Sequence, residues 1–291
     1  MNEKRVIGLD LGGTKILAGV VDREGHVQQR REHQTPTASQ DELLAGLDAA
    51  VEELLTDEIA ALGFGLPSPV DQRSGRALQA VNIPLKDIDF RARMKERFGL
   101  PVGIENDANA ATYAEFRFGA ARDVESMIML TLGTGCGGGA VIDGKLFRGW
   151  AELGHVVIVE DGEPCRGACS GRGHVEAYCS GRAADEVARR ILGPGTSARD
   201  LVAQHHPALE SIGHHLGVAI GSLVNIFNPE MVVIGGGFGV AALDLLLPAA
   251  RLAVLTEALA PAGQELSIQP AELGARAGLI GAGLVAFEAV G

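Results

Sequence analysis

The chain has 291 residues, of which 46% are hydrophobic, so it can bury one large core or two ordinary ones and is not a disordered chain. Its 40 glycines cluster in short loops without a repeat, which excludes a collagen-like or low-complexity protein. A net charge of −12 argues against a surface that binds nucleic acid. No signal peptide precedes the first predicted strand, and no stretch of about 18 uninterrupted apolar residues is found. We therefore expect a cytoplasmic protein with reduced cysteines and no membrane partner.

The first third of the chain alternates predicted strands with predicted helices. Short aliphatic and β-branched runs predict strands, and apolar residues three and four apart predict amphipathic helices. On these patterns we predict strands at Arg5–Leu9, Ile16–Val21, Val27–Gln34, Ile59–Gly65 and Val102–Glu105, and helices at Ser39–Leu55, Asp87–Phe98 and Asn106–Phe118.

The same order of elements then starts again. We predict a strand at Met127–Leu132, a glycine loop at 133–139, a hairpin from Ala140–Ile142 to Lys145–Phe147, helices at Gly181–Ile191 and Pro207–Phe227, a strand at Met231–Ile234, and helices at Val240–Leu255 and Gly274–Val290. Three strands followed by a helix and a strand, occurring twice, predict two related α/β domains with a cleft between them. We expect the first domain to span 1–118 and a larger second domain to span 119–275.

The most informative stretch joins the first two predicted strands and contains Asp10, Gly12, Gly13, Thr14 and Lys15. The two glycines let a ligand approach the backbone amides, and the carboxylate suits a hydrated magnesium ion. This chemistry indicates a phosphate-binding hairpin, although an ordinary Gly-Gly turn has the same glycines. A Walker A loop is excluded, because Thr14-Lys15 reverses its final pair and a strand follows instead of a helix.

Two further glycine clusters follow predicted strands. Gly133, Gly135 and Gly138 match G-x-G-x-x-G, but a predicted hairpin follows them instead of a helix, which excludes a dinucleotide-binding fold. Thr134 favours phosphate contact over a plain surface loop. The third cluster could hold the nucleoside end of a ligand or allow tight strand-to-helix packing; it comprises Gly235, Gly236 and Gly237.

Several motifs together resemble the ROK family of repressors and sugar kinases, within the actin-like ATPase and sugar kinase superfamily. They are Gly8–Lys15, Glu105–Ala111, Leu132–Gly139, Glu152–His155 and the cysteine segment that ends at Glu176. The resemblance runs from about residue 5 to the C-terminus, and the order of the motifs is specific although each alone is not. It implies the actin-like, ribonuclease H-like fold, two α/β domains with an interdomain cleft, and a C-terminal helix at about 276–291 that packs back on the first domain.

The resemblance implies transfer of a phosphoryl group from ATP to a sugar. Asp107 would be the general base that takes the proton from the sugar hydroxyl, although an aspartate at a helix start can also be only an N-cap. Asp10 would hold magnesium through water, and the glycine bends would hold the phosphates of ATP. The residues implied in sugar binding are Asn82, Asn106, Asp107, Glu152, His155 and Glu176.

The chain departs from the family pattern at two of these motifs. Leu85-Lys86 stand just after the Asn82 motif, where a tryptophan is often found, so the Asn82 match is weaker. Ala151 precedes Glu152 where the family usually has glycine.

Four residues form a candidate zinc site: His155, Cys165, Cys169 and His174. Two cysteines and two histidines are a tetrahedral zinc set. The resemblance implies a structural zinc held by His155 and three cysteines, but here two extra residues separate the first two cysteines and His174 replaces the last one. Cys179 is the rival fourth ligand, and a Cys165–Cys169 disulfide is the alternative to a metal site.

We therefore expect ATP-dependent phosphorylation of a hexose at its 6-hydroxyl, with glucose as the first candidate, by a homo-oligomer (a dimer or tetramer). The alternative substrates are N-acetylmannosamine, N-acetylglucosamine, fructose and allose, and polyphosphate is an alternative donor. A sugar-sensing regulator is the alternative function. Repressors of the family carry a winged helix-turn-helix before the first phosphate motif, whereas about seven residues precede Gly8.

Overall fold

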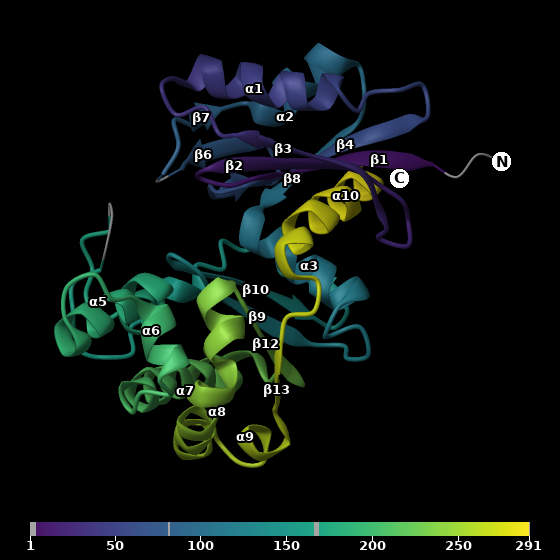
Figure 1. Ribbon diagram of the computed structural model, residues 1–291. Helices are drawn as coiled ribbons and strands as arrows, with labels where there is room; N and C mark the ends of the chain where they lie inside the picture. The colour runs from purple at the N-terminus through teal and green to yellow at the C-terminus, as the bar shows by residue number, and fades with distance from the viewer. Residues whose placement is uncertain (1–3, 81, 166–168, 291) are drawn as a thin grey trace. The chain divides into compact units, whose positions relative to one another are not determined.

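The computed structural model describes residues 4–80, 82–165 and 169–290, and the chain divides into two compact units (Figure 1). Unit 1 comprises Met1–Gly119, Arg148–Trp150 and Ala275–Gly291, and unit 2 comprises Ala120–Phe147 and Ala151–Gly274. The short segment Arg148–Trp150 thus belongs to unit 1, although the residues on either side of it belong to unit 2.

Unit 1 is built on a five-stranded sheet with the order β3-β2-β1-β4-β8. The first three strands form an antiparallel meander, and β4 and β8 continue the sheet in parallel with β1. Their bounds are β1 Arg5–Leu11, β2 Lys15–Val21, β3 Val27–Gln34, β4 Ile59–Leu66 and β8 Val102–Asn106. A small second sheet comprises β5 Val70–Asp71, β6 Arg76–Gln79 and β7 Lys86–Ile88.

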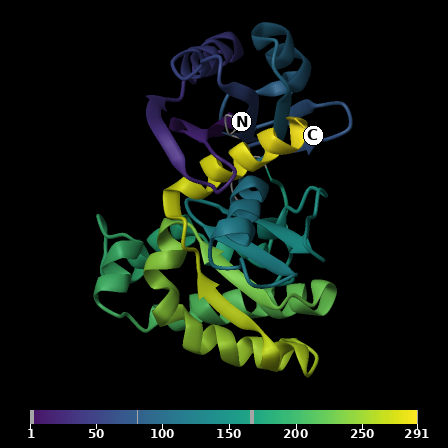
Figure 2. The same cartoon turned by 90° about the vertical axis from the view of Figure 1, so that its right-hand side faces the viewer.

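Helices cover both faces of the large sheet of unit 1. Helices α1 (Gln40–Glu52) and α2 (Phe90–Phe98) lie on one face, and α3 (Asp107–Phe118) and α10 (Ala277–Val290) lie on the other (Figures 1 and 2). Apolar residues of α1 and α2 pack with those of β1, β2 and β4 to form the main core of this unit. The C-terminal helix therefore completes a unit that is otherwise built from the first 119 residues and the short segment Arg148–Trp150.

A row of glycines lets α10 lie close against the sheet. Gly8, Gly63 and Gly103 stand side by side on β1, β4 and β8 in the strand register. A Cβ atom added at any of the three would lie within 2.4 Å of a backbone carbonyl oxygen of α10. Because no real Cβ makes such a contact, only glycine at these positions allows the helix to pack at this distance.

Unit 2 repeats the strand pattern of unit 1, with the order β11-β10-β9-β12-β13. An antiparallel meander again forms one half of the sheet, and two strands parallel to β9 form the other. The strands are β9 Met127–Leu132, β10 Cys136–Ile142, β11 Lys145–Leu146, β12 Met231–Gly235 and β13 Ser267–Pro270. The helices are α4 Val175–Cys179, α5 Gly181–Leu192, α6 Ala198–Ala203, α7 Ala208–Phe227, α8 Gly237–Glu257 and α9 Ala262–Glu265, with a short 3₁₀ turn at Leu153–His155. A second 3₁₀ turn, Gly274–Arg276, begins at the last residue of unit 2 and continues into unit 1.

Among the described residues, α8 is the one helix long and apolar enough to cross a membrane by length and composition. It packs along α7 and against β9, β12 and β13. Core helices of globular proteins have the same length and composition, so this finding is weak evidence for a membrane span.

The two repeated α/β patterns predicted from the sequence are both present, but several predicted boundaries are wrong. The helix predicted to end at Leu55 ends at Glu52, and the one predicted from Gly274 begins at Ala277 after a 3₁₀ turn. The glycine loop expected at 133–139 is shorter, because Gly137–Gly139 lie in β10 and pair with β9. The helix expected from Asp87 begins at Phe90, because β7 uses Lys86–Ile88 and Asp89 caps the helix. Helix α8 begins three residues before the predicted Val240. Glycines and polar residues hide such boundaries when strand pairing or capping decides them.

Candidate active site

The first glycine bend joins β1 to β2 in unit 1. The Gly12 amide donates to the Lys15 carbonyl oxygen at 2.9 Å and closes the turn. Thr35 braces it, because its hydroxyl donates to the Gly12 carbonyl oxygen at 2.8 Å and its amide to the Thr14 carbonyl oxygen at 3.0 Å. The turn is thus held largely through its carbonyl groups, and its exposed tip at Gly13 and Thr14 can present amides to an anion.

Two side chains expected at the site flank this bend. Asn82 is exposed, and its Cβ lies 3.7 Å from where a Cβ on Gly13 would stand. Lys15 is half-exposed, and its ammonium lies 3.3 Å from the Glu32 carboxylate. An exposed pair of this kind contributes little stability, so Lys15 can exchange Glu32 for a phosphate.

Asp10 and Asp107 both lie beside Gly65, near the end of β4. A Cβ added at Gly65 would lie 3.8 Å from Asp10 Oδ1 and 3.6 Å from the Cα of Asp107. Asp10 also packs on the first turn of α10, where a Cβ at Gly278 would lie 2.4 Å from its Oδ2. Burial raises the pKa of Asp10 to about 6, and the charge of Lys15 opposes this rise. A bound cation would favour the ionised form.

Helix α3 begins directly beside this point. Asn106 is the N-cap, and its Oδ1 accepts from the amides of Ala108 at 2.9 Å and Asn109 at 3.1 Å. Asp107 is the first helical residue, and its Oδ1 accepts from the Ala108 amide at 2.8 Å. The interpretation of Asp107 as the N-cap is therefore wrong, because Asn106 has that role. The cap also occupies the Asn106 oxygen, so its amide nitrogen is the group that can reach a ligand.

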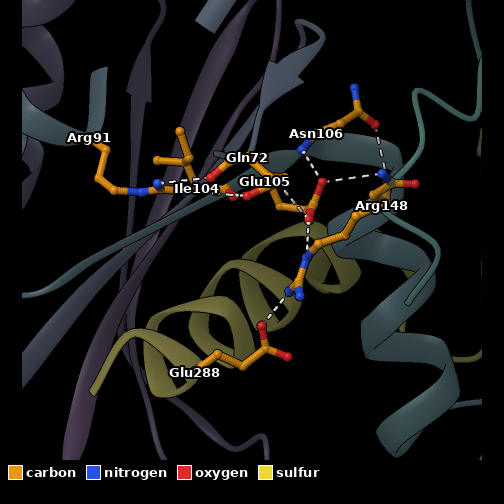
Figure 3. Close-up of polar contacts among 8 residues, drawn as sticks. Gln72, Arg91, Ile104, Glu105, Asn106, Arg148 and Glu288 are labelled. Carbon is orange, nitrogen blue, oxygen red and sulfur yellow. Dashed lines mark hydrogen bonds and ion pairs between the residues drawn. The ribbon is translucent and has the colours of Figure 1, made fainter. Parts of the chain in front are cut away.

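Glu105, one residue before the cap, is buried in a network of donors (Figure 3). Its Oε1 accepts from the Asn106 amide at 3.0 Å and from Asn109 Nδ2 at 3.2 Å. Its Oε2 accepts from Gln72 Nε2 at 2.9 Å and from Arg148 Nε at 3.1 Å. Four donors, one of them the cation of Arg148, compensate the charge of this carboxylate under the start of α3.

The second glycine bend, between β9 and β10, opens onto a cavity in unit 2. The Gly133 amide donates to the Gly135 carbonyl oxygen at 3.0 Å, and the Gly133 carbonyl oxygen accepts from the Gly181 amide at 2.7 Å. The cavity has a volume of about 690 Å³, which suits a ligand the size of a nucleotide. Three residues predicted from the glycine clusters line it, together with two arginines and an aromatic ring: Gly133, Thr134, Gly237, Arg182, Arg199 and Phe238.

The third glycine cluster connects β12 to α8 beside this cavity. Gly235 ends the strand, Gly236 is the N-cap with φ +79°, and Gly237 begins the helix. A Cβ at Gly236 would lie 2.4 Å from the carbonyl carbon of Leu132. Glycine is therefore required for the packing of this turn, and contact with the nucleoside end of a ligand stays a prediction.

Unit 2 also brings together the three residues expected to bind sugar hydroxyls. Burial raises the pKa of Glu152, the nearby His155 lowers it, and the Glu176 carboxylate raises it further. Glu176 reaches the second glycine bend as well, because its Oε2 accepts from the Cys136 amide at 2.8 Å. Two carboxylates and an imidazole at one place can accept hydrogen bonds from neighbouring hydroxyl groups.

The four predicted metal ligands form one cluster, with their ligand atoms within 4.8 Å of one another. His155 Nδ1 lies 3.2 Å from His174 Nδ1, Cys165 Sγ lies 3.6 Å from His155 Nδ1, and Cys169 Sγ lies 3.7 Å from His174 Nδ1. Ordinary zinc–nitrogen and zinc–sulfur bond lengths give tetrahedral edges of about 3.3 Å between nitrogens and about 3.6 Å between nitrogen and sulfur. The group could therefore hold a zinc ion with all four ligands.

Cys179, the rival ligand, lies outside this cluster. Its side chain is fully buried in the core of unit 2, and its Sγ lies 3.9 Å from the Ile212 carbonyl oxygen. No disulfide joins Cys165 to Cys169 in the described part of the chain. The two extra residues between Cys165 and Cys169 fall within 166–168, outside the described residues.

Sequence reasoning missed the cations around these sites. Arg148 follows a predicted hairpin with no motif around it, and Arg182 and Arg199 lie on two different helices. Glu105 was recognised only as part of a motif, and its position at the end of a buried strand was the available sign that its charge needs a partner.

The chain is similar in fold and in sequence to known proteins. The chain has the two-sheet α/β architecture of the actin-like sugar kinases, and its fold matches a solved ROK family glucokinase from Streptomyces griseus, in complex with glucose and AMPPNP, with a TM-score of 0.82. That match covers 98% of this chain and 99% of the other, at 33% identity.

The ROK family model matches residues 6–289, and the chain belongs to the ROK family. It is 33% identical to the glucokinase of Streptomyces coelicolor, with 97% of each chain covered. It is also 27% identical to the xylose repressor of Bacillus subtilis, in a match that covers 97% of this chain and 77% of the repressor.

Proposed function

We propose that this protein is an ATP-dependent hexose kinase that transfers a phosphoryl group to the 6-hydroxyl of glucose. One observation supports the chemistry most directly: Asp10 Oδ1 and the Cα of Asp107 both lie beside Gly65 near the end of β4, within the unit that carries the first glycine bend. The similarity to glucokinases over nearly the whole chain supports glucose as the acceptor.

In the proposed reaction, Asp107 accepts the proton of the sugar's 6-hydroxyl while the hydroxyl oxygen bonds to the γ-phosphorus of ATP. The bond between this phosphorus and the β–γ bridging oxygen breaks, and ADP leaves with that oxygen. Asp10 would hold a hydrated magnesium ion, which neutralises charge on the phosphates. The amides of both glycine bends, with Lys15, would bind the phosphates.

The remaining predicted residues have binding roles in this proposal. The 690 Å³ cavity would hold the nucleoside of ATP, with Arg182 and Arg199 in its lining as cations for the adjoining phosphates. Sugar hydroxyls would bind to five side chains: Asn82, Asn106, Glu152, His155 and Glu176. A structural zinc would use the Nδ1 atoms of both histidines and brace the loop that carries Glu152. We also propose a cytoplasmic homo-oligomer, either a dimer or a tetramer.

A sugar-sensing regulator is the second candidate, because xylose repressors also match the chain. The intact Asp107, together with two glycine bends and a nucleotide-sized cavity, favours the kinase. Kinases for N-acetylmannosamine, N-acetylglucosamine, fructose or allose are variants of the same proposal, since the residues named here do not discriminate at the sugar's 2-position.

The test is a substrate panel with the purified full chain. Each of the five sugars is assayed with MgATP and with polyphosphate, and the phosphorylated position is identified by NMR. We expect glucose with ATP to give the highest kcat/KM and glucose 6-phosphate as product. Another preferred sugar would refute the substrate, and no turnover with any sugar, combined with a promoter-DNA gel shift, would refute the kinase.

A further inference from the structure

The ion pair between buried Glu105 and solvent-exposed Arg148 lies outside every role assigned above. Glu105 is 2% exposed, so its charge depends on protein partners instead of water. Gln72 and Asn109 contribute neutral amides, and Arg148 contributes the cation of the network. The orientation of Gln72 is itself held, because Arg91 donates to its backbone oxygen at 3.0 Å and to its side-chain oxygen at 3.4 Å (Figure 3).

Arg148 reaches two carboxylates from one side chain. Its Nε donates to Glu105 Oε2 at 3.1 Å, and its Nη2 pairs with Glu288 on α10. The planar guanidinium makes both contacts at once, which the single ammonium of lysine cannot reproduce. Figure 3 shows this side chain extending between the two acidic residues.

The place of Arg148 in the chain gives this contact its significance. The segment Arg148–Trp150, here called the strap, belongs to unit 1, while Phe147 before it and Ala151 after it belong to unit 2. Glu152 follows the strap by two residues. At the other end of the pair, Glu105 precedes the cap of α3 and Asp107.

We propose that Arg148 is a positioning residue: its pairing with Glu105 anchors the strap that leads to Glu152 and, by the same contact, balances the buried charge beneath the start of α3 that carries Asp107. This inference rests on the proposed kinase function for its kinetic consequences. The anchoring of the strap stands on the structure alone.

The chain supplies its own probe of the strap. Trp150 is the sole tryptophan of the sequence, and it is 65% exposed. Its fluorescence anisotropy reports motion of the strap without any ligand or turnover. The variant R148M removes the guanidinium and keeps most of the aliphatic stem, and R122M is the matched control, because Arg122 forms an exposed pair with Glu272 at 2.8 Å in unit 2.

We expect R148M to lower the Trp150 anisotropy and to reduce kcat/KM for the sugar about 10- to 100-fold, while R122M changes neither. In the double variant E105Q/R148M, the buried charge that R148M leaves unpaired is removed, but the strap still lacks its anchor. We therefore expect the double variant to recover kcat at least several-fold over R148M while the low anisotropy persists. This separation distinguishes positioning from a general loss of stability, which would move both readouts together.

An R148M protein with wild-type anisotropy and kcat/KM within twofold of wild type would overturn the proposal. If R148M does not fold, R148K is measured beside the double variant, and wild-type behaviour in R148K would overturn it as well. If the wild-type protein phosphorylates no sugar, the proposed function fails, and the anisotropy of R148M still decides whether Arg148 anchors the strap.

Discussion

The Glu176 carboxylate accepts a hydrogen bond from the backbone amide of Cys136 at 2.8 Å, and this contact joins two motifs that lie 40 residues apart. Cys136 begins β10, directly after the glycine bend, and Glu176 lies on α4, two residues after the metal-cluster residue His174. A Cβ at Gly135 would lie 2.4 Å from the same carboxylate oxygen. Glu176 thus supports the bend in addition to its proposed contact with sugar.

Removing this contact should weaken nucleotide binding in the absence of sugar. We expect Glu176→Ala to reduce the affinity for AMPPNP about 3- to 10-fold, because the loss of one hydrogen bond costs about 1 kcal/mol. Glu176→Gln keeps an acceptor oxygen for the Cys136 amide and should bind the nucleotide as the wild type does. Calorimetric titration measures both, and equal affinities in all three proteins would limit Glu176 to the sugar.

Substituting the proposed general base should separate binding from chemistry. Asp107→Asn keeps the size of the side chain and an oxygen that can accept from the Ala108 amide. It cannot take up a proton, so we expect kcat to fall about 100- to 10,000-fold while the affinity for glucose stays within a few-fold of wild type. Steady-state kinetics and equilibrium sugar binding check the two parts, and near-normal turnover would remove Asp107 from its role.

The metal cluster predicts which cysteines hold zinc. We expect one zinc per chain in the wild type, well below one in Cys169→Ser, and one again in Cys179→Ser, because Cys179 is buried away from the cluster. Chelation should lower the melting temperature of the wild type, since a closed four-ligand site contributes to folding. Elemental analysis after gel filtration provides the measurement. Zinc lost from Cys179→Ser and kept in His174→Ala would instead make Cys179 the fourth ligand.

Asp10 should make the ligand-free protein less stable as the pH rises. Its pKa is raised to about 6 from its ordinary value of 3.8, so the folded state holds this proton more tightly than the unfolded state does. Stability is therefore lost between these two values as the pH increases. Asp10→Asn removes the penalty and should be the more stable protein near pH 8, by at most about 3 kcal/mol because the residue is partly exposed.

The difference between the two proteins should shrink to near zero around pH 4, and Asp10→Asn should lose activity with MgATP. Urea unfolding without nucleotide or magnesium at both pH values tests this. A difference that is the same at the two pH values would contradict the ionisation of Asp10 as its cause.

Ala151 has φ +46°, a left-handed conformation that favours glycine. We expect Ala151→Gly to raise the free energy of unfolding by about 0.5–1 kcal/mol, since the relief of strain exceeds the extra chain entropy of glycine. Ala258 has φ −83°, so Ala258→Gly is the control and should lower stability. Parallel urea titrations compare them, and a loss of stability in both would show that no strain is stored at Ala151.

Features that depend on neighbouring residues in the chain could be predicted from the sequence. Alternating strand and helix patterns predicted both repeats, and the glycine bends at Gly12-Gly13 and Gly133–Gly135 fall where turn chemistry put them. The residues of the metal cluster were recognisable because the types of ligand side chain are few. These signals are local, since a turn or a helix period depends on neighbours in the chain.

Contacts between residues that are far apart in the chain could be identified from the folded structure alone. Arg148 belongs to unit 1 and pairs with Glu105, although 42 residues lie between them and no motif marks the arginine. The Nδ1 atoms of His155 and His174 lie 3.2 Å apart, and Asp10 and Asp107 both lie beside Gly65. Burying an unpaired charge costs free energy, so a buried charged residue needs a partner. That partner can lie anywhere in the chain, and the spacing of residues in the sequence does not reveal it.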